Sequence, residues 1–134
     1  MVLHYYDIDK SEKELAQECQ ASPELGVPAK DLLTLAQKYG LKGFIKDNCE
    51  FSDIAHYVID KKVPVIVDWF QISDGHYSVV SDINHKYIYL VDPYLGAPIS
   101  IKLTKFYRIW FDFPGAYLHH KQDLILRRMI VIYK

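Results

Sequence analysis

Cysteine and long apolar runs are scarce in this sequence. Its 134 residues include two cysteines, Cys19 and Cys49, which make neither a disulfide framework nor a zinc-binding spacing. The longest apolar stretches, such as 63–67 and 129–133, are far shorter than a bilayer span, and the N-terminus lacks a signal segment. We therefore expect a cytoplasmic protein without cofactor or metal, in which both cysteines react with alkylating agents at ordinary thiol rates.

An excess of charge of either sign is also missing. Sixteen Lys and Arg residues oppose seventeen Asp and Glu residues, which gives a net charge of -1. This balance creates no field that would attract nucleic acid or an acidic membrane, so no nucleic-acid partner is expected. Half of the residues are hydrophobic, which is enough for one packed core. With no linker in view, the composition predicts a single domain over residues 1–134.

Helical patterns occupy the first part of the chain. The segment 1–6 is apolar from its first residue and has no capping side chain ahead of it, so it has the character of a helix end whose first turns are missing. Val2, Leu3 and Tyr5 would then continue a buried helix face. The trough left by the missing turns would be covered by self-association, by a refolded N-terminus or by a bound peptide.

Three further helices follow from capping signals. The capping-box spacing of Ser11 and Glu14 predicts a short helix over about 12–19. Pro28 at the start and Gly40 at the end bound a well-defined amphipathic helix. Ser52 is the expected cap of a fourth helix.

After residue 62 the sequence changes to short β-branched runs separated by turn residues, which is typical of an antiparallel sheet. A tight turn is expected at 84–86, a short helix at 105–110, and an irregular aromatic loop at 111–120. Helices that are segregated from a mostly antiparallel sheet indicate an α+β domain. About five strands are expected, at 64–70, 76–83, 87–91, 99–103 and 124–133. A short sixth strand at 41–45 is left open.

One pair of residues has the spacing of catalytic machinery. His76 begins a predicted strand, and Asp92 follows the next strand sixteen positions later. A hairpin bent at 84–86 brings both to one edge of the sheet. A general-base imidazole needs one nitrogen fixed by a carboxylate, so that the other nitrogen can take the proton of a nucleophile. Taken alone, the pair is more often structural, because a Gly-His at a strand start and an Asp-Pro turn after a strand are both common.

The other five histidines, at positions 4, 56, 85, 119 and 120, have no Cys, Asp or Glu at ligand spacing. We therefore interpret them as structural or surface residues, and no metal site is expected.

Several short motifs follow one another in an informative order: the helix end at 1–6, Tyr-Gly-Leu at 39–41, Pro-Val-Ile-Val at 64–67, Gly-His-Tyr at 75–77, Asp-Pro at 92–93 with Gly96, and the pair Phe106 and Trp110. This order resembles, over nearly the whole chain, the bacterial papain-like cysteine peptidases that process bacteriocin precursors at a double-glycine leader. Those domains occur alone or at the front of peptide-exporting ABC transporters.

The resemblance implies a papain-like fold in which N-terminal helices pack on the sheet. It also implies His76 as the base and Asp92 as its orienting acid. The partners that it implies are a peptide substrate or leader peptide and an ABC exporter.

The departure from that family concerns the nucleophile. In the family a Cys-Gly-Pro motif starts the first helix, and by this alignment the cysteine would lie about seven residues before Met1, with the oxyanion Gln still further upstream. Neither Cys19 nor Cys49 falls at the head of a helix that faces His76, so the chain as given is expected to be inactive.

Three functions stay open. One is a leader peptidase whose recorded chain begins inside the catalytic helix. Another is a non-catalytic module that docks a peptide or regulates a transporter. The third, a structural protein without a site, predicts that His76 and Asp92 point apart.

Overall fold

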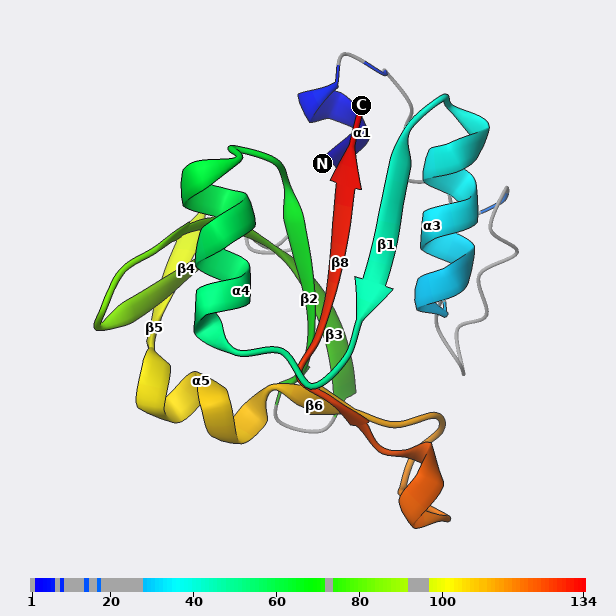
Figure 1. Cartoon of the computed structure of the whole chain (residues 1–134). Helices are drawn as coiled ribbons and strands as arrows, with labels where there is room; N and C mark the ends of the chain where they lie inside the picture. Colours follow the sequence, from blue (N-terminus) through cyan, green and yellow to red (C-terminus); the bar gives the residue numbers. More distant parts are fainter. Residues whose placement is uncertain are drawn as a thin grey trace.

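The structure, a computed structural model, describes residues 2–6, 8, 14, 17, 28–71, 74–91 and 97–134, with the main chain alone at residues 3, 4 and 74 (Figure 1). A six-stranded antiparallel sheet has the order β1-β8-β2-β3-β4-β5, and a two-stranded ribbon β6-β7 lies at one end of it. The strands are β1 (Lys42–Lys46), β2 (Val65–Gln71), β3 (Asp74–Ile83), β4 (Tyr87–Val91), β5 (Pro98–Lys102), β6 (Phe111–Asp112), β7 (Ile125–Leu126) and β8 (Arg128–Tyr133).

The described helices pack around this sheet. Within the described residues, no helix is long and apolar enough to cross a membrane. The predicted helix over 12–19 lies outside the described residues, apart from Glu14 and Gln17, which are both helical. The elements are α1 (Val2–Tyr5), α3 (Ala29–Lys38), α4 (Phe51–Ala55), which continues as a π-helix η1 (His56–Asp60), α5 (Leu103–Ile109) and the 3-10 turn η2 (Lys121–Asp123).

The boundaries predicted for α3 are confirmed, and the cap predicted for α4 is wrong. Pro28 precedes α3 in an extended conformation, and Gly40 follows it with a φ of 83°, which glycine adopts without strain. The cap of α4 is Glu50 and not Ser52. Glu50 and Asp53 form a reciprocal capping box, in which the Glu50 backbone N–H donates to Asp53 Oδ2 at 2.8 Å. This capping box satisfies two backbone N–H groups at the start of the helix, whereas the Ser52 hydroxyl as a cap would satisfy one.

The sheet prediction is confirmed in its open alternative and needs two corrections. The short strand left open at 41–45 is present as β1, which gives the sheet six strands. The strand predicted at 124–133 is interrupted at Arg127, which has a φ of 48° and donates its backbone N–H to the Trp110 carbonyl at 2.9 Å. The aromatic loop predicted from residue 111 begins instead with β6, which pairs with β7. The turn at 84–86 is confirmed, because Asn84 Oδ1 accepts the N–H groups of Lys86 and Tyr87.

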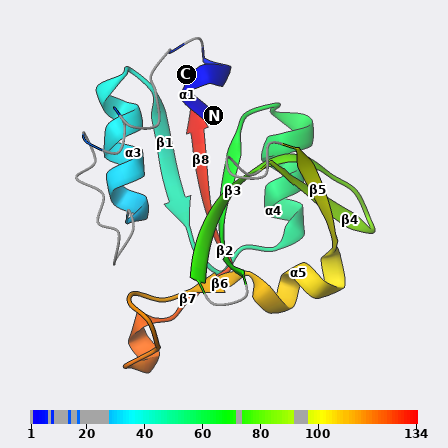
Figure 2. The same cartoon turned by 180° about the vertical axis from the view of Figure 1, so that it is seen from behind.

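Alternate residues of the central strands supply a core on each face of the sheet. Met129 and Val131 of β8 face the side covered by α4, η1 and α5, whereas Ile130 and Ile132 face the side of α1 and α3. Figures 1 and 2 show α3 beside β1, with α4 and α5 on the other flank of the sheet. The α+β class is confirmed. Both faces are buried because the strands carry apolar residues on both sides.

The N-terminal helix lies beside the end of β8 in both views (Figures 1 and 2). Val2 is half-buried against the core on the α3 side, and Tyr6 donates its hydroxyl to the Ile132 carbonyl at 2.7 Å. The prediction that Tyr5 continues a buried face is wrong, since Tyr5 is 60% exposed. Tyr6, in the turn directly after α1, is the half-buried tyrosine instead.

Candidate active site

His76 lies near the start of β3, half-buried, on the sheet face that is covered by α4 and α5. It pairs across the strands with Trp69 of β2. The two rings meet edge to face, with centroids 5.7 Å apart and an interplanar angle of 87°. Directly opposed residues of antiparallel strands share a face, so the Trp69 ring forms the packing surface against which the imidazole is oriented.

Trp69 is itself held in place. Its indole Nε1 donates to Ser78 Oγ at 3.0 Å, and both residues are buried. On its other side the Trp69 ring makes an edge contact with Phe106 of α5, with centroids 6.0 Å apart. The imidazole of His76 is therefore backed by a rigid aromatic wall, which is the support that a catalytic base needs.

The predicted partner of His76, Asp92, lies outside the described residues. The strand pairing is described up to the preceding residue: Val79 of β3 is opposite Val91 of β4. This register brings the end of β4 to the same end of the sheet as His76, three residues along β3. Among the residues that the structure describes, no group of three or more His, Cys, Asp or Glu side chains could hold a metal ion.

Cys49 is not available as a nucleophile. Its side chain is fully buried, and its thiol donates to the Lys46 carbonyl at 3.3 Å. Burial, with a further contribution from nearby Asp53, raises the pKa of the Cys49 thiol to about 11. The raised pKa disfavours the reactive thiolate, so for Cys49 we now expect alkylation that is slower than the ordinary thiol rate. Cys19 lies outside the described residues.

A second group of ionisable side chains lies on the opposite face of the same strands, and the sequence analysis missed it. Asp68 of β2 is 1% exposed and is paired across the strands with Tyr77 of β3 and Arg128 of β8. Its carboxyl group lies within hydrogen-bonding reach of that of Asp112 on β6, and its Oδ1 has no hydrogen-bond partner within the described part of the chain. A lone Asp within the apolar run 65–70 was the available signal.

Burial dominates the electrostatics of this second group. Desolvation, followed by the hydrogen bond and the charge of Asp112, raises the pKa of Asp68 far above its ordinary value. Burial also raises the pKa of Tyr77, and the charges of Asp68 and Asp112 add to the effect. Arg128 cannot neutralise Asp68 fully, because its guanidinium is bound in a bidentate fashion to Asp47 at 2.6 and 3.0 Å.

The sequence of this chain matches one protein family over most of its length. The model of the peptidase C39 family matches residues 1–114. The chain belongs to the peptidase C39 family. The matched range includes both His76 and Asp92. None of the curated proteins matches this C39 chain.

Two solved structures share the fold of this C39 chain. One is the peptidase domain of Streptococcus ComA, a bi-functional ABC transporter involved in a quorum-sensing pathway. It has a TM-score of 0.71 and 15% identity, over 98% of this chain and 84% of that one. The other is a double-glycine-motif protease from an AMS/PCAT transporter in complex with the leader peptide. Its TM-score is 0.65 and its sequence identity 22%, and the match covers 99% of this chain and 78% of that one. The fold is thus that of the papain-like C39 peptidase domains, and it includes residues beyond 114.

Proposed function

We propose that this C39 chain acts on peptides that carry a double-glycine leader, with His76 as the general base and Asp92 as the residue that orients it. The observation that carries the proposal is the family match over residues 1–114, which spans both side chains. Two findings support it. The imidazole is backed by the wall of Trp69 and Phe106, and β4 ends opposite Val79, three residues from His76 along β3.

Peptide cleavage by this machinery needs a thiol that the described residues do not supply. The base would take the thiol proton, and the thiolate would attack the carbonyl carbon of the second glycine of the leader. His76 would then protonate the leaving amine, and water would hydrolyse the thioester and regenerate the thiol. Because Cys49 is buried and the pKa of its thiol is raised to about 11, we propose that Cys49 is not the nucleophile and that the chain as given does not cleave peptides.

The catalytic roles can be tested by supplying that thiol. A helical segment starting with Cys-Gly-Pro is fused ahead of Met1, and cleavage of a double-glycine peptide is followed by mass spectrometry. We expect a new, rapidly alkylated thiol and leader cleavage, both lost in the His76→Ala variant. The matched control is His85→Ala, which alters an exposed histidine in the β3-β4 turn and should leave both readouts intact. An extended protein whose thiol reactivity is unchanged by His76→Ala would contradict the assignment of the base.

A peptide-docking role is the second candidate, and one observation favours it: the AMS/PCAT neighbour was solved with a leader peptide bound. Docking needs no nucleophile, so the 134-residue chain itself should bind a double-glycine leader peptide, and calorimetry measures this directly. Binding that survives in both the parent chain and the His76→Ala variant, while the extended protein cleaves nothing, would identify the chain as a docking module.

A further inference from the structure

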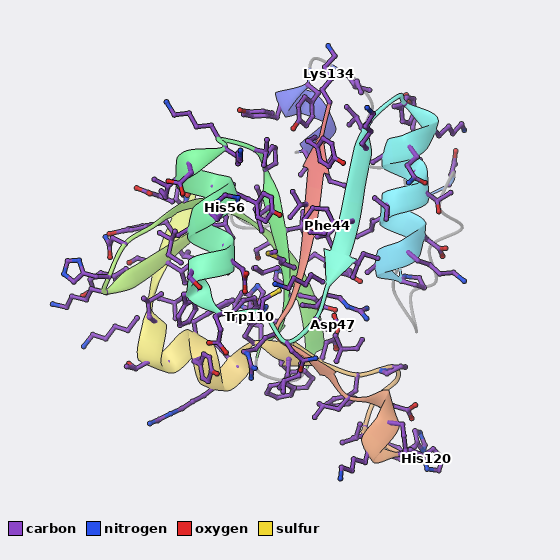
Figure 3. All side chains as sticks on the ribbon, viewed as in Figure 1. Phe44, Asp47, His56, Trp110, His120 and Lys134 are labelled. Atoms are coloured by element: carbon purple, nitrogen blue, oxygen red, sulfur yellow. The ribbon has the colours of Figure 1, made fainter. Side chains whose placement is uncertain are left out.

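The acid pair Asp68 and Asp112 joins two parts of the molecule that are distant in sequence. Asp68 lies in the middle of the sheet, on β2, whereas Asp112 belongs to the arm, the name used here for residues 111–126. The arm comprises β6, β7 and the segment between them, and it projects from the lower end of the sheet (Figures 1 and 2). His120 lies at its far end (Figure 3). The contact between the two carboxyl groups is therefore a tether between arm and sheet.

The tether reaches the strand that carries His76. The carboxyl group of Asp112 lies directly over Gly75, where a Cβ atom would collide with both carboxyl oxygens. Asp112 Oδ1 also accepts the Phe113 backbone N–H at 2.7 Å, which holds the carboxyl group in this orientation. Beside it, the Phe70 ring stacks on Phe111 and Phe113, with centroids 5.1 and 5.2 Å apart. Apolar stacking and one polar contact together close the arm onto β2 and β3.

The polar contact requires a proton. Two carboxylates cannot hydrogen-bond to each other, because both would only accept, so this contact becomes a hydrogen bond only when one of the two groups carries a hydrogen atom. The surrounding charges do not replace that proton. Arg128 of β8 is bound to Asp47, Tyr77 of β3 is neutral, and Asp47, after β1, adds a further negative charge. Asp31 of α3 adds another negative charge facing Tyr77.

We propose that Asp68 and Asp112 form a proton-sharing carboxyl pair that closes the arm onto the sheet beside Gly75 and releases it when the shared proton is lost. Release would expose the stacked face of Phe70, free the backbone of Gly75 next to His76, and let both carboxylates enter water. The inference concerns a different face of the sheet from His76 and does not depend on the proposed catalytic roles.

Proton linkage determines whether a rise in pH opens or closes the arm. The pKa of Asp68 is raised in the closed form, so the closed form binds more protons than the open form between the ordinary and the raised pKa. Opening is therefore favoured as the pH rises. If opening releases one proton, the opening equilibrium constant grows about tenfold per pH unit within that window.

Amide hydrogen exchange of the arm tests the proposal. Protection factors of residues in 111–126, corrected for the intrinsic pH dependence of exchange, are measured between about pH 5 and pH 8. In the parent protein we expect them to fall about tenfold per pH unit. In Asp68→Asn we expect protection that is independent of pH, because an amide is neutral throughout and can still donate to Asp112. The control Asp123→Asn removes another carboxyl group of the arm. Its protection factors should fall with pH as steeply as those of the parent protein.

The result that would overturn the proposal is a parent protein whose arm protection does not change with pH, or an Asp68→Asn variant with the same slope as the parent. Carbon NMR of the side-chain carboxyl groups gives a second readout that needs no variant. One of the two resonances should titrate well above the range of ordinary aspartates. Two ordinary titrations would exclude a shared proton, whether or not the chain binds or cleaves peptides.

Discussion

At Gly75 the strand of His76 meets the arm. Replacing Gly75 by Ala places a methyl group against the Asp112 carboxyl, and moving that short side chain breaks its contact with Asp68. We expect Gly75→Ala to lower the free energy of unfolding by about 1–3 kcal/mol in urea denaturation.

The same contact predicts a coupling between the two positions. Gly75→Ala should cost much less in an Asp112→Ala background, where the collision is gone. Additive effects of the two substitutions would show that the methyl group and the carboxyl group do not compete for one space.

Cys49 makes a prediction about thiol chemistry. In a Cys19→Ser background, Cys49 is the remaining cysteine, and its thiol is protonated at pH 8 because its pKa is raised to about 11. Labelling by a thiol reagent should be about a hundredfold slower than for a free cysteine, and should recover on adding denaturant. Rapid labelling of the folded protein would mean that the site opens readily or that its thiolate is stabilised.

At the scale of elements, the start of α4 depends on two acidic residues. Asp53 accepts the Glu50 N–H and a 3.0 Å hydrogen bond from Lys46, and its pKa is lowered, first by the bond to the Glu50 backbone. Asp53→Ala should cost about 1 kcal/mol near neutral pH. A lowered pKa stabilises the folded state above the ordinary value, so the difference between variant and parent should shrink as the pH falls through the folded-state pKa.

Ser52 provides the matched control for that prediction. The sequence pattern favours it as the cap, yet it is exposed and Glu50 holds the cap position. Ser52→Ala should change the free energy of unfolding by less than about 0.5 kcal/mol in the same thermal or chemical denaturation. A loss comparable to that of Asp53→Ala would return the capping role to the serine.

At the scale of the whole molecule, the last strand completes the sheet. β8 lies between β1 and β2, and its residues 129–132 are buried on both faces. Deleting residues 128–134 should abolish cooperative unfolding in calorimetry, because both cores lose their central strand. Deleting only the exposed residues 133 and 134 should preserve it. A cooperative transition in the shorter protein would show that β1 and β2 can pair without β8.

The buried acid also affects the stability of the molecule as a function of pH. The pKa of Asp68 is raised on folding, so its contribution is present below the ordinary value and is lost as the pH rises toward the folded-state pKa. The free energy of unfolding of Asp68→Asn should therefore increase relative to the parent protein above about pH 4, by up to about 1.4 kcal/mol per pH unit. A constant difference across this range would indicate that Asp68 ionises normally in the folded protein.

Local patterns were enough to predict much of this architecture. Pro28 and Gly40 bound α3, the turn at 84–86 joins β3 to β4, and the apolar alternation of residues 87–91 coincides with β4. Each of these signals depends on a residue and its near neighbours in the chain, through dihedral preference, capping and side-chain period. The spacing of His76 and Asp92 belongs to the same class, although the geometry of that pair remains a prediction.

The tertiary structure alone decided the features that depend on distant partners. Arg127 interrupts the last strand because the Trp110 carbonyl accepts its N–H, and burial raises the pKa of the Cys49 thiol. Asp68 and Asp112 are separated by forty-four positions, and no local period connects them. They meet because β6 crosses the end of β2 and β3, where Asp68 is buried. The energy of a buried charge is set by what surrounds it in space and not by its neighbours in sequence.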